Sequence, residues 1–227
     1  MGDYLKTEIK KIGIIGGTGK EGKGLAYRWA NAGYEIKIGS RQIEKAVTTA
    51  NELGKLISGN GMIEGVSNLQ AAEEADLAVL TVPFSAHRLV LESVKPYLSG
   101  KILIDVTVPL VPPKVTVVQM PPAGSSSKEA QQILGDSVMV VAAFQNISYE
   151  NLLQNRELHC DILVCGNSSS ARDIVIKLIR DIGLVGLDAG PLENAVVVEG
   201  LTSILIGLNK RFGVKDSGIQ ITGIPRT

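Results

Sequence analysis

A glycine-rich segment near the N-terminus carries the residue pattern with the most chemical meaning in this sequence. Residues 17–22 read Gly-Thr-Gly-Lys-Glu-Gly and match the pattern G-x-G-x-x-G. The pattern alone is weak, because glycine is common. Here it follows an apolar run at 11–15 and precedes a segment with helical spacing of apolar residues. A strand, a glycine turn and a helix in this order predict a dinucleotide-binding turn.

Each glycine of the turn has an expected role in holding a diphosphate. Gly17 allows the tight turn, Gly19 lets the backbone approach the pyrophosphate, and Gly22 lets the helix pack on its strand. The anion then meets unpaired N–H groups at the positive end of the helix dipole. The residues expected to bind the cofactor here are Gly16, Gly17, Thr18, Gly19, Lys20 and Glu21. Lys20 is equally well interpreted as a solvent-facing turn residue.

The end of the second predicted strand indicates which dinucleotide is bound. NAD-binding sites usually place a carboxylate there, but this sequence reads Gly-Ser-Arg at 39–41. Arg41 can grip a 2′-phosphate bidentately, with Ser40 donating a hydroxyl and Lys45 adding charge one turn later. The pattern therefore favours NADP over NAD. In the alternative interpretation, Ser40 only caps a helix whose solvated face carries Arg41 and Lys45.

Strands and helices alternate along the chain. Strands are predicted at 11–15, 35–39, 62–65, 77–82, 101–106, 137–144, 161–165 and 184–188, and helices at 23–32, 41–53, 68–74, 86–98, 168–182 and 192–211. This order predicts an α/β fold with a doubly wound, mostly parallel, Rossmann-like sheet and a small C-terminal α/β extension. We expect a tail at 1–10 and one domain at 11–227. Its part from about 145 to 227 should complete a second-substrate cleft and a dimer interface.

Ligands of open parallel sheets lie across the carboxyl ends of the strands. The residues after the fourth, fifth and sixth strands, which should line the nicotinamide side, are Pro83, Phe84, Thr107, Pro109 and Ala143 with the three residues after it. Phe84 either stacks on a ring or forms an apolar wall. The proline-rich and serine-rich stretch 109–127 is predicted to be a long loop, either a substrate cover or a disordered excursion.

No side chain is predicted to be catalytic. His87 is interpreted as a surface helix histidine rather than a catalytic group, and a catalytic role for His159 has even less support. Asp105 either caps the N–H groups of its own loop or acts as a base or substrate ligand. No nucleophile–base arrangement is legible, which suits hydride transfer, where the cofactor carries the chemistry.

Composition argues against several classes of partner. The 23 basic and 23 acidic residues balance, so nothing favours nucleic acid or an anionic membrane as a partner. We expect no membrane span, no secretory signal in the first ten residues and a cytoplasmic location. Cys160 and Cys165 should face opposite sides of a sheet as buried thiols, and no metal site is predicted.

Several blocks of the sequence resemble one family, the NADPH-dependent coenzyme F420 reductases, also called F420H2:NADP oxidoreductases. The blocks are residues 14–19 with 22–26, 39–41 with 44–46, 78–83 and 187–192. The resemblance implies direct hydride transfer between nicotinamide C4 and deazaflavin C5, and a homodimer. It also implies that Thr18, Ser40, Arg41 and Lys45 bind NADP while Val82 and Pro83 flank the nicotinamide.

One departure from the family concerns the second substrate. Where members of the family often have a histidine after the sixth strand, this chain has Gln145. Two alternatives stay open: an imine reductase resembling pyrroline-5-carboxylate reductase, and a non-catalytic NADP-binding sensor. The length of the chain argues against the first, because those enzymes need a long helical C-terminal domain.

Overall fold

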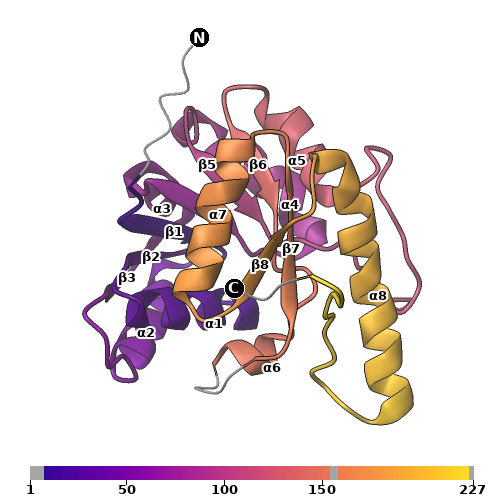
Figure 1. Cartoon of the computed structure of the whole chain (residues 1–227). Helices are drawn as coiled ribbons and strands as arrows, with labels where there is room; N and C mark the ends of the chain where they lie inside the picture. The colour runs from indigo at the N-terminus through magenta and orange to yellow at the C-terminus, as the bar shows by residue number, and fades with distance from the viewer. Residues whose placement is uncertain (1–7, 154–157, 225–227) are drawn as a thin grey trace.

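In the computed structural model, which describes residues 8–153 and 158–224, one eight-stranded sheet forms the centre of the molecule (Figure 1). Its order is β3-β2-β1-β4-β5-β6-β7-β8. The strands are β1 (Lys11–Ile15), β2 (Glu35–Ser40), β3 (Met62–Ser67), β4 (Leu77–Leu80), β5 (Ile102–Asp105), β6 (Met139–Ala142), β7 (Asp161–Gly166) and β8 (Val185–Asp188). Every neighbouring pair is parallel except β6 and β7. The predicted doubly wound, mostly parallel α/β fold is confirmed.

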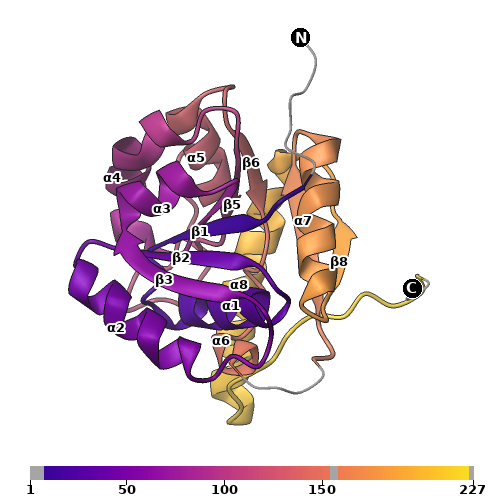
Figure 2. The ribbon, with the colours of Figure 1, turned by 90° about the vertical axis from the view of Figure 1, so that its left-hand side faces the viewer.

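The sheet separates two apolar cores. One face is covered by α1 (Lys20–Asn31), α2 (Ile43–Gly54) and α7 (Ser169–Asp181), and the other by α3 (Asn68–Glu74), α4 (Phe84–Val94) and α5 (Ser126–Leu134) (Figure 2). Central strands such as β4 are buried on both faces, which explains why they read as unbroken apolar runs. Cys160 belongs to the first core and Cys165 to the second, so the two thiols do lie on opposite faces.

Some predicted helix boundaries were wrong. Helix α1 begins at Lys20 rather than 23, so the glycine turn leads directly into it. Helix α2 begins at Ile43 with Gln42 as its N-cap, because Ser40 still belongs to β2. Helix α4 begins at Phe84 and ends at Val94, where the 3₁₀ turn η1 (Lys95–Tyr97) follows.

Helix α5 and the short helix α6 (Tyr149–Leu152) were not predicted. The N-cap of α5 is Ser125, whose hydroxyl accepts the Lys128 N–H at 3.0 Å. The helix ends at Gly135, which has a positive φ of 77°. A serine before and a glycine after are ordinary helix signals. The prolines and serines preceding them outweighed these signals in the sequence interpretation.

The last helix, α8 (Ala195–Phe212), follows the 3₁₀ turn η2 (Leu192–Asn194) and stands beside the sheet (Figure 1). Among the described residues, the segment Leu192–Phe212 is long and apolar enough to cross a membrane, and 39% of its most apolar window is buried within the protein. Its inner face packs on α5, on the turn after β6 and on the loop after β5. A side chain at Gly200 would lie 3.4 Å from Met120 and 3.5 Å from Val118.

Candidate functional site

The glycine turn after β1 is held in one conformation by backbone contacts. Gly16 has a φ of 75°, a conformation that favours glycine. A Cβ at Gly17 would lie 2.9 Å from the Ile14 carbonyl oxygen, so the tight turn also needs glycine at position 17, as predicted. Asn68 of α3 fixes it by accepting the Gly16 N–H at 3.0 Å. A Cβ at Gly22 would lie 2.6 Å from the Cα of Gly17, which confirms that Gly22 allows close packing of helix on turn.

Gly19 differs from the other glycines of the turn. Its φ of −72° is ordinary for any residue, and a Cβ there would lie 3.7 Å from the nearest protein atom, the carbonyl oxygen of Gly16. The protein itself therefore does not require glycine at this position. Gly19 is the N-cap of α1 and supplies no side-chain acceptor to its first N–H groups. This arrangement leaves the positive end of α1 open to an anionic ligand.

A first cavity of about 510 Å³ extends from this helix end to the end of β2. Most of the residues predicted to bind cofactor line it: Gly16, Thr18, Gly19, Ser40, Arg41, Lys45, Val82 and Pro83. Arg41 and Lys45 are exposed, so their cations face solvent and any ligand in the cavity. The Ser40 hydroxyl accepts the Gln42 N–H at 3.1 Å, which tightens the turn into α2.

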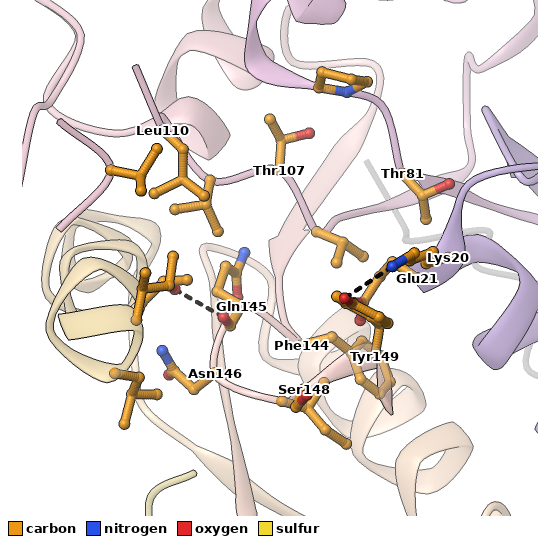
Figure 3. A pocket seen from close by; sticks show the side chains of 18 of the residues that line it. Lys20, Glu21, Thr81, Thr107, Leu110, Phe144, Gln145, Asn146, Ser148 and Tyr149 are labelled. Carbon is orange, nitrogen blue, oxygen red and sulfur yellow. Dashed lines mark hydrogen bonds between the residues drawn. The ribbon is translucent and has the colours of Figure 1, made fainter. Parts of the chain in front are cut away.

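A second cavity of about 690 Å³ adjoins the first. The two share Gly19, Thr81, Val82 and Pro83, so they form one cleft over the carboxyl ends of the strands. Lys20, Glu21 and Thr107 line the second cavity (Figure 3). Phe84 lines it as well. Three predicted residues, Gly17, Pro109 and Ala143, line neither cavity, and Pro109 and Ala143 are buried.

The walls of the second cavity come from distant parts of the chain. Leu110, Pro112 and Val115 of the loop after β5 form one side, and Leu205 and Ile206 of α8 form another. The loop thus covers the cavity, as one of its two interpretations expected. Closure of this loop during turnover stays a prediction. The contribution of α8 was expected only in general terms, because the sequence does not reveal which face of that helix meets the cleft.

The turn after β6 presents polar groups to this cavity. It begins at Phe144, the only non-glycine residue with a positive φ (73°) among those described. Such backbone strain persists only where the surrounding structure holds it. Here Phe144 packs edge-on against Trp29 at 5.7 Å, and Thr202 of α8 donates its hydroxyl to the Gln145 carbonyl oxygen at 2.7 Å. The side chains of Gln145 and Asn146 are thereby fixed beside the cavity.

Among the residues that the structure describes, four buried polar atoms of this cavity have no hydrogen-bond partner. They are Glu21 Oε1, Thr107 Oγ1, Gln145 Oε1 and Asn146 Oδ1. Buried polar groups without partners are rare and costly, so four in one cavity indicate groups that await a ligand. Sequence patterns did not single out Asn146, because the hydrogen bonds that orient it come from a helix about 50 residues later.

Lys20 and Glu21, the first residues of α1, have unlike environments. The Lys20 ammonium donates to the Tyr149 hydroxyl at 3.0 Å, and this bond raises the pKa of the lysine. Loss of hydration raises the pKa of Glu21 to about 8. Glu21 therefore enters the cavity mainly as a neutral acid at pH 7, able to donate as well as accept.

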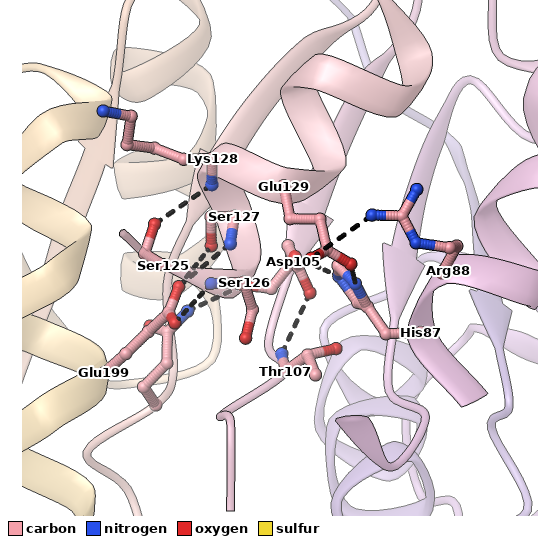
Figure 4. Close-up of polar contacts among 11 residues, drawn as sticks. His87, Arg88, Asp105, Thr107, Ser125, Ser126, Ser127, Lys128, Glu129 and Glu199 are labelled. Carbon is pink, nitrogen blue, oxygen red and sulfur yellow. Dashed lines mark hydrogen bonds and ion pairs between the residues drawn. The ribbon is translucent and has the colours of Figure 1, made fainter. Parts of the chain in front are cut away.

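A buried polar cluster around Asp105 contacts Thr107, one of the residues that line the second cavity (Figure 4). His87 is almost fully buried, with Nε2 2.9 Å from Asp105 Oδ2 and Nδ1 3.7 Å from Glu129 Oε1, so its interpretation as an unpaired surface histidine was wrong. Burial by itself lowers the pKa of His87, but the carboxylates of Asp105 and Glu129 have the larger effect, so the pKa is raised. The other Asp105 oxygen accepts the Thr107 N–H at 3.0 Å, which confirms the predicted loop cap. His159 is exposed.

Glu199 connects α8 to this region. Its carboxylate is fully buried and accepts the backbone N–H groups of Ser126 and Ser127 at 2.7 and 3.0 Å, at the start of α5. Desolvation, with Asp105 nearby, raises the pKa of Glu199 to about 7. This contact ties the loop after β5 and helix α8 into one wall of the second cavity.

The parallel sheet, the glycine turn and the cleft over the strand ends define a protein of the Rossmann-like class, in which a nucleotide cofactor lies across the strand ends. Residues 11–109 match the family model described as NADP oxidoreductase coenzyme F420-dependent. The chain belongs to the family of F420-dependent NADP reductases. Such a reductase from Methanothermobacter marburgensis is 39% identical over 95% of this chain and 99% of its own length.

Other relatives agree with this assignment. The F420-dependent NADP reductase of Methanocaldococcus jannaschii is 39% identical over 94% of this chain and 99% of its own length. A crystal structure from Arthrobacter sp. FB24 superposes with a TM-score of 0.79 at 21% identity, covering 95% of this chain and all of that one. The NADP-bound pyrroline carboxylate reductase of Plasmodium falciparum gives 0.56 at 17% identity, with 91% of this chain and 66% of that one covered. The last two likenesses concern the fold alone.

Proposed function

We propose that this protein transfers a hydride between NADP(H) and the deazaflavin coenzyme F420. One observation carries the proposal: two cavities meet over Gly19, Thr81, Val82 and Pro83, so a nicotinamide ring at the junction can face a second flat ring. The family supports the choice of substrates, because relatives covered over nearly their whole length are F420-dependent NADP reductases. The imine reductase and sensor alternatives have no comparable support.

The first cavity is the proposed NADP site. The diphosphate would lie on the N-terminal N–H groups of α1, which no side chain of the N-cap occupies. The 2′-phosphate would lie against Arg41 and Lys45, with Ser40 at the end of β2. Thr18 lines the same cavity, where its hydroxyl would donate to a phosphate. Val82 and Pro83 would flank the nicotinamide at the junction.

The second cavity is the proposed deazaflavin site. Apolar residues such as Val106, Leu110 and Ile147 make most of its wall, which suits a flat aromatic ring. When bound, the two rings supply the redox chemistry, and the protein orients them and excludes water. Phe84 and Thr107 line the part of the cavity next to the junction.

Steady-state turnover tests the proposal. The protein is mixed with NADPH and oxidised F420, and the loss of deazaflavin absorbance is followed over a broad pH range. We expect turnover with NADPH and little with NADH. Binding of NADPH without turnover would favour the sensor, and turnover of a cyclic imine in place of F420 would favour the imine reductase.

We also propose a homodimer formed through the outer face of α8. Val197, Ile204 and Phe212 recur along this face and are 63, 51 and 68% exposed. A second copy of the same helix would bury this stripe, as in the symmetric interfaces of most homo-oligomers. Ile204→Glu should give a monomer by light scattering, whereas the exposed Glu193→Gln should not. A monomeric wild type that binds lipid vesicles would instead assign the face to a membrane.

A cytoplasmic location fits this activity and is part of the proposal. Cys160 and Cys165 are free thiols on opposite faces of the sheet, so no disulfide joins them. Unpaired thiols of this kind are typical of reducing compartments. Cell fractionation with detection of the native protein checks the location.

A further inference from the structure

The side-chain amides of Gln145 and Asn146 each form a hydrogen bond to the protein through the nitrogen and none through the oxygen. Gln145 donates through Nε2 to the carbonyl oxygen of Asp105 at 2.7 Å. Asn146 donates through Nδ2 to the carbonyl oxygen of Val198 at 2.8 Å. The opposite ends, Gln145 Oε1 and Asn146 Oδ1, are buried and have no partner.

The orientation of each amide follows from the chemistry of its partner. A backbone carbonyl only accepts hydrogen bonds, so the amide nitrogen must face it and the amide oxygen must face away. Rotating either amide by half a turn would set two oxygens against each other. The residues are 4 and 3% exposed, so water outside the protein does not satisfy these oxygens. Two acceptors are therefore fixed at the second cavity and lack a donor.

We propose that Gln145 and Asn146 select the second substrate by accepting hydrogen bonds from ring N–H groups, and that they admit only a flat heterocycle whose edge carries such a donor. This inference rests on the proposed function and deepens it. A deazaflavin carries one such donor, the N–H between the two carbonyls of its pyrimidinedione edge, and both amide oxygens can accept it in a shared, three-centre hydrogen bond. Thr107 can serve either a donor or an acceptor, because its unpaired hydroxyl can rotate.

The two acceptors belong to the second substrate rather than to the nicotinamide. Both residues line only the second cavity, and neither lies among the residues shared at the junction. Both are also held from the far side of that cavity: Asn146 bonds to α8, and Thr202 of α8 holds the Gln145 backbone. A ring that reaches them lies beyond Val82 and Pro83, away from the dinucleotide.

Comparison of two deazaflavins on the wild-type protein tests the proposal without any mutation. The probes are the tailless 5-deazaflavin and the same ring methylated at the N–H of its pyrimidinedione edge. We expect methylation to lower kcat/KM with NADPH by at least about 100-fold, because sites built to bind an N–H reject analogues that lack it. Equal turnover of both rings would overturn the acceptor assignment and leave the proposed reaction standing. Turnover of neither probe nor F420 would instead count against the reaction.

A matched pair of variants separates hydrogen bonding from steric exclusion of the methyl group. Asn146→Leu removes the unpaired acceptor together with the amide bond to Val198, and it keeps the branching of the side chain. Asn209→Leu removes an amide of the same cavity whose oxygen already accepts the Ser217 N–H at 3.0 Å. The methylation penalty is the ratio of kcat/KM for the unmethylated ring to kcat/KM for the methylated ring. This ratio should be at least about tenfold smaller in Asn146→Leu than in the wild type, and it should be unchanged in Asn209→Leu. Gln145→Met should act like Asn146→Leu.

Binding of NADPH provides the second readout for each variant. Its dissociation constant, measured by fluorescence titration, should change less than about threefold in Asn146→Leu and Gln145→Met, a difference below 1 kcal/mol. Weaker NADPH binding with an unchanged methylation penalty would assign the acceptors to the nicotinamide carboxamide and overturn the proposal. Thermal unfolding of each variant shows whether the variant is folded. The comparison of the two deazaflavins on the wild-type protein does not depend on any variant.

Discussion

His87 and Asp105 form a buried pair with 2.9 Å between Nε2 and Oδ2, although they are 18 residues apart in sequence. The pair joins the first turns of α4 to the end of β5, directly behind Thr107 of the second cavity. Neither side chain lines the cavities, so the pair positions the loop rather than touching a ligand.

Removal of His87 should strongly destabilise the protein. The substitution His87→Phe leaves the buried carboxylate of Asp105 without its partner, and breaking such a pair costs about 3–5 kcal/mol. Urea unfolding measures the loss. Arg88→Ala is the control, because Arg88 reaches Glu129, a neighbour of His87, from an exposed position. A loss below about 1 kcal/mol for His87→Phe would contradict the pair's structural role.

The same pair predicts a pH dependence. The folded state raises the pKa of His87, so its contribution to stability is complete below the ordinary pKa of histidine. It disappears as the pH rises through the raised value. The difference in melting temperature between wild type and His87→Phe should therefore shrink from pH 6 to pH 9. A difference that grows over this range would contradict the assignment.

Gly19 and Gly22 should respond differently to alanine. A Cβ at Gly22 meets the Gly17 backbone at 2.6 Å, so Gly22→Ala should lower the melting temperature. Gly19→Ala has room within the protein and should leave stability within about 1 kcal/mol of wild type. Gly19→Ala should nevertheless lower the affinity for NADPH by at least about tenfold, or 1.4 kcal/mol, because its methyl group occupies the phosphate site. Unchanged NADPH affinity in Gly19→Ala would place the diphosphate elsewhere.

Arg41 should decide between the two dinucleotides. Arg41→Ala removes charge-assisted hydrogen bonds to a 2′-phosphate, worth about 1.5–3 kcal/mol. The affinity for NADPH should therefore fall by about 10- to 100-fold. NADH affinity should stay within about twofold. Fluorescence titration with each dinucleotide measures both. Equal weakening of NADPH and NADH would mean that Arg41 does not read the 2′-phosphate.

Glu21 should make the protein less stable as the pH rises. Its pKa is about 8 in the folded protein and 4.5 in its ordinary state, so the folded state binds the extra proton between these values. The stability it contributes is complete below pH 4.5 and falls as the pH rises to about 8. Glu21→Gln should melt progressively higher than wild type across this window, whereas the exposed Glu44→Gln should not. A difference that stays constant with pH would contradict the raised pKa.

The sequence predicted the sheet and the first cavity well, because these depend on local patterns. Apolar runs ended by glycine or proline located the strands. Ser40 ends its strand, and Gly19 and Arg41 follow theirs at short range. His87 was misread because its partners come from β5 and α5, and no spacing rule joins those elements. The same holds for Asn146, whose orientation depends on Val198. The second cavity is built from such long-range contacts, so only its general location could be predicted from local sequence patterns.

Transfer of an isotope label tests the central claim most directly, namely that two rings meet in one cleft. NADPH carrying deuterium at the transferred position of C4 is mixed with oxidised F420 and the protein in ordinary water. The deuterium should appear at C5 of the reduced deazaflavin without dilution by solvent hydrogen. Loss of the label to water would contradict direct transfer between the rings across the junction at Val82 and Pro83.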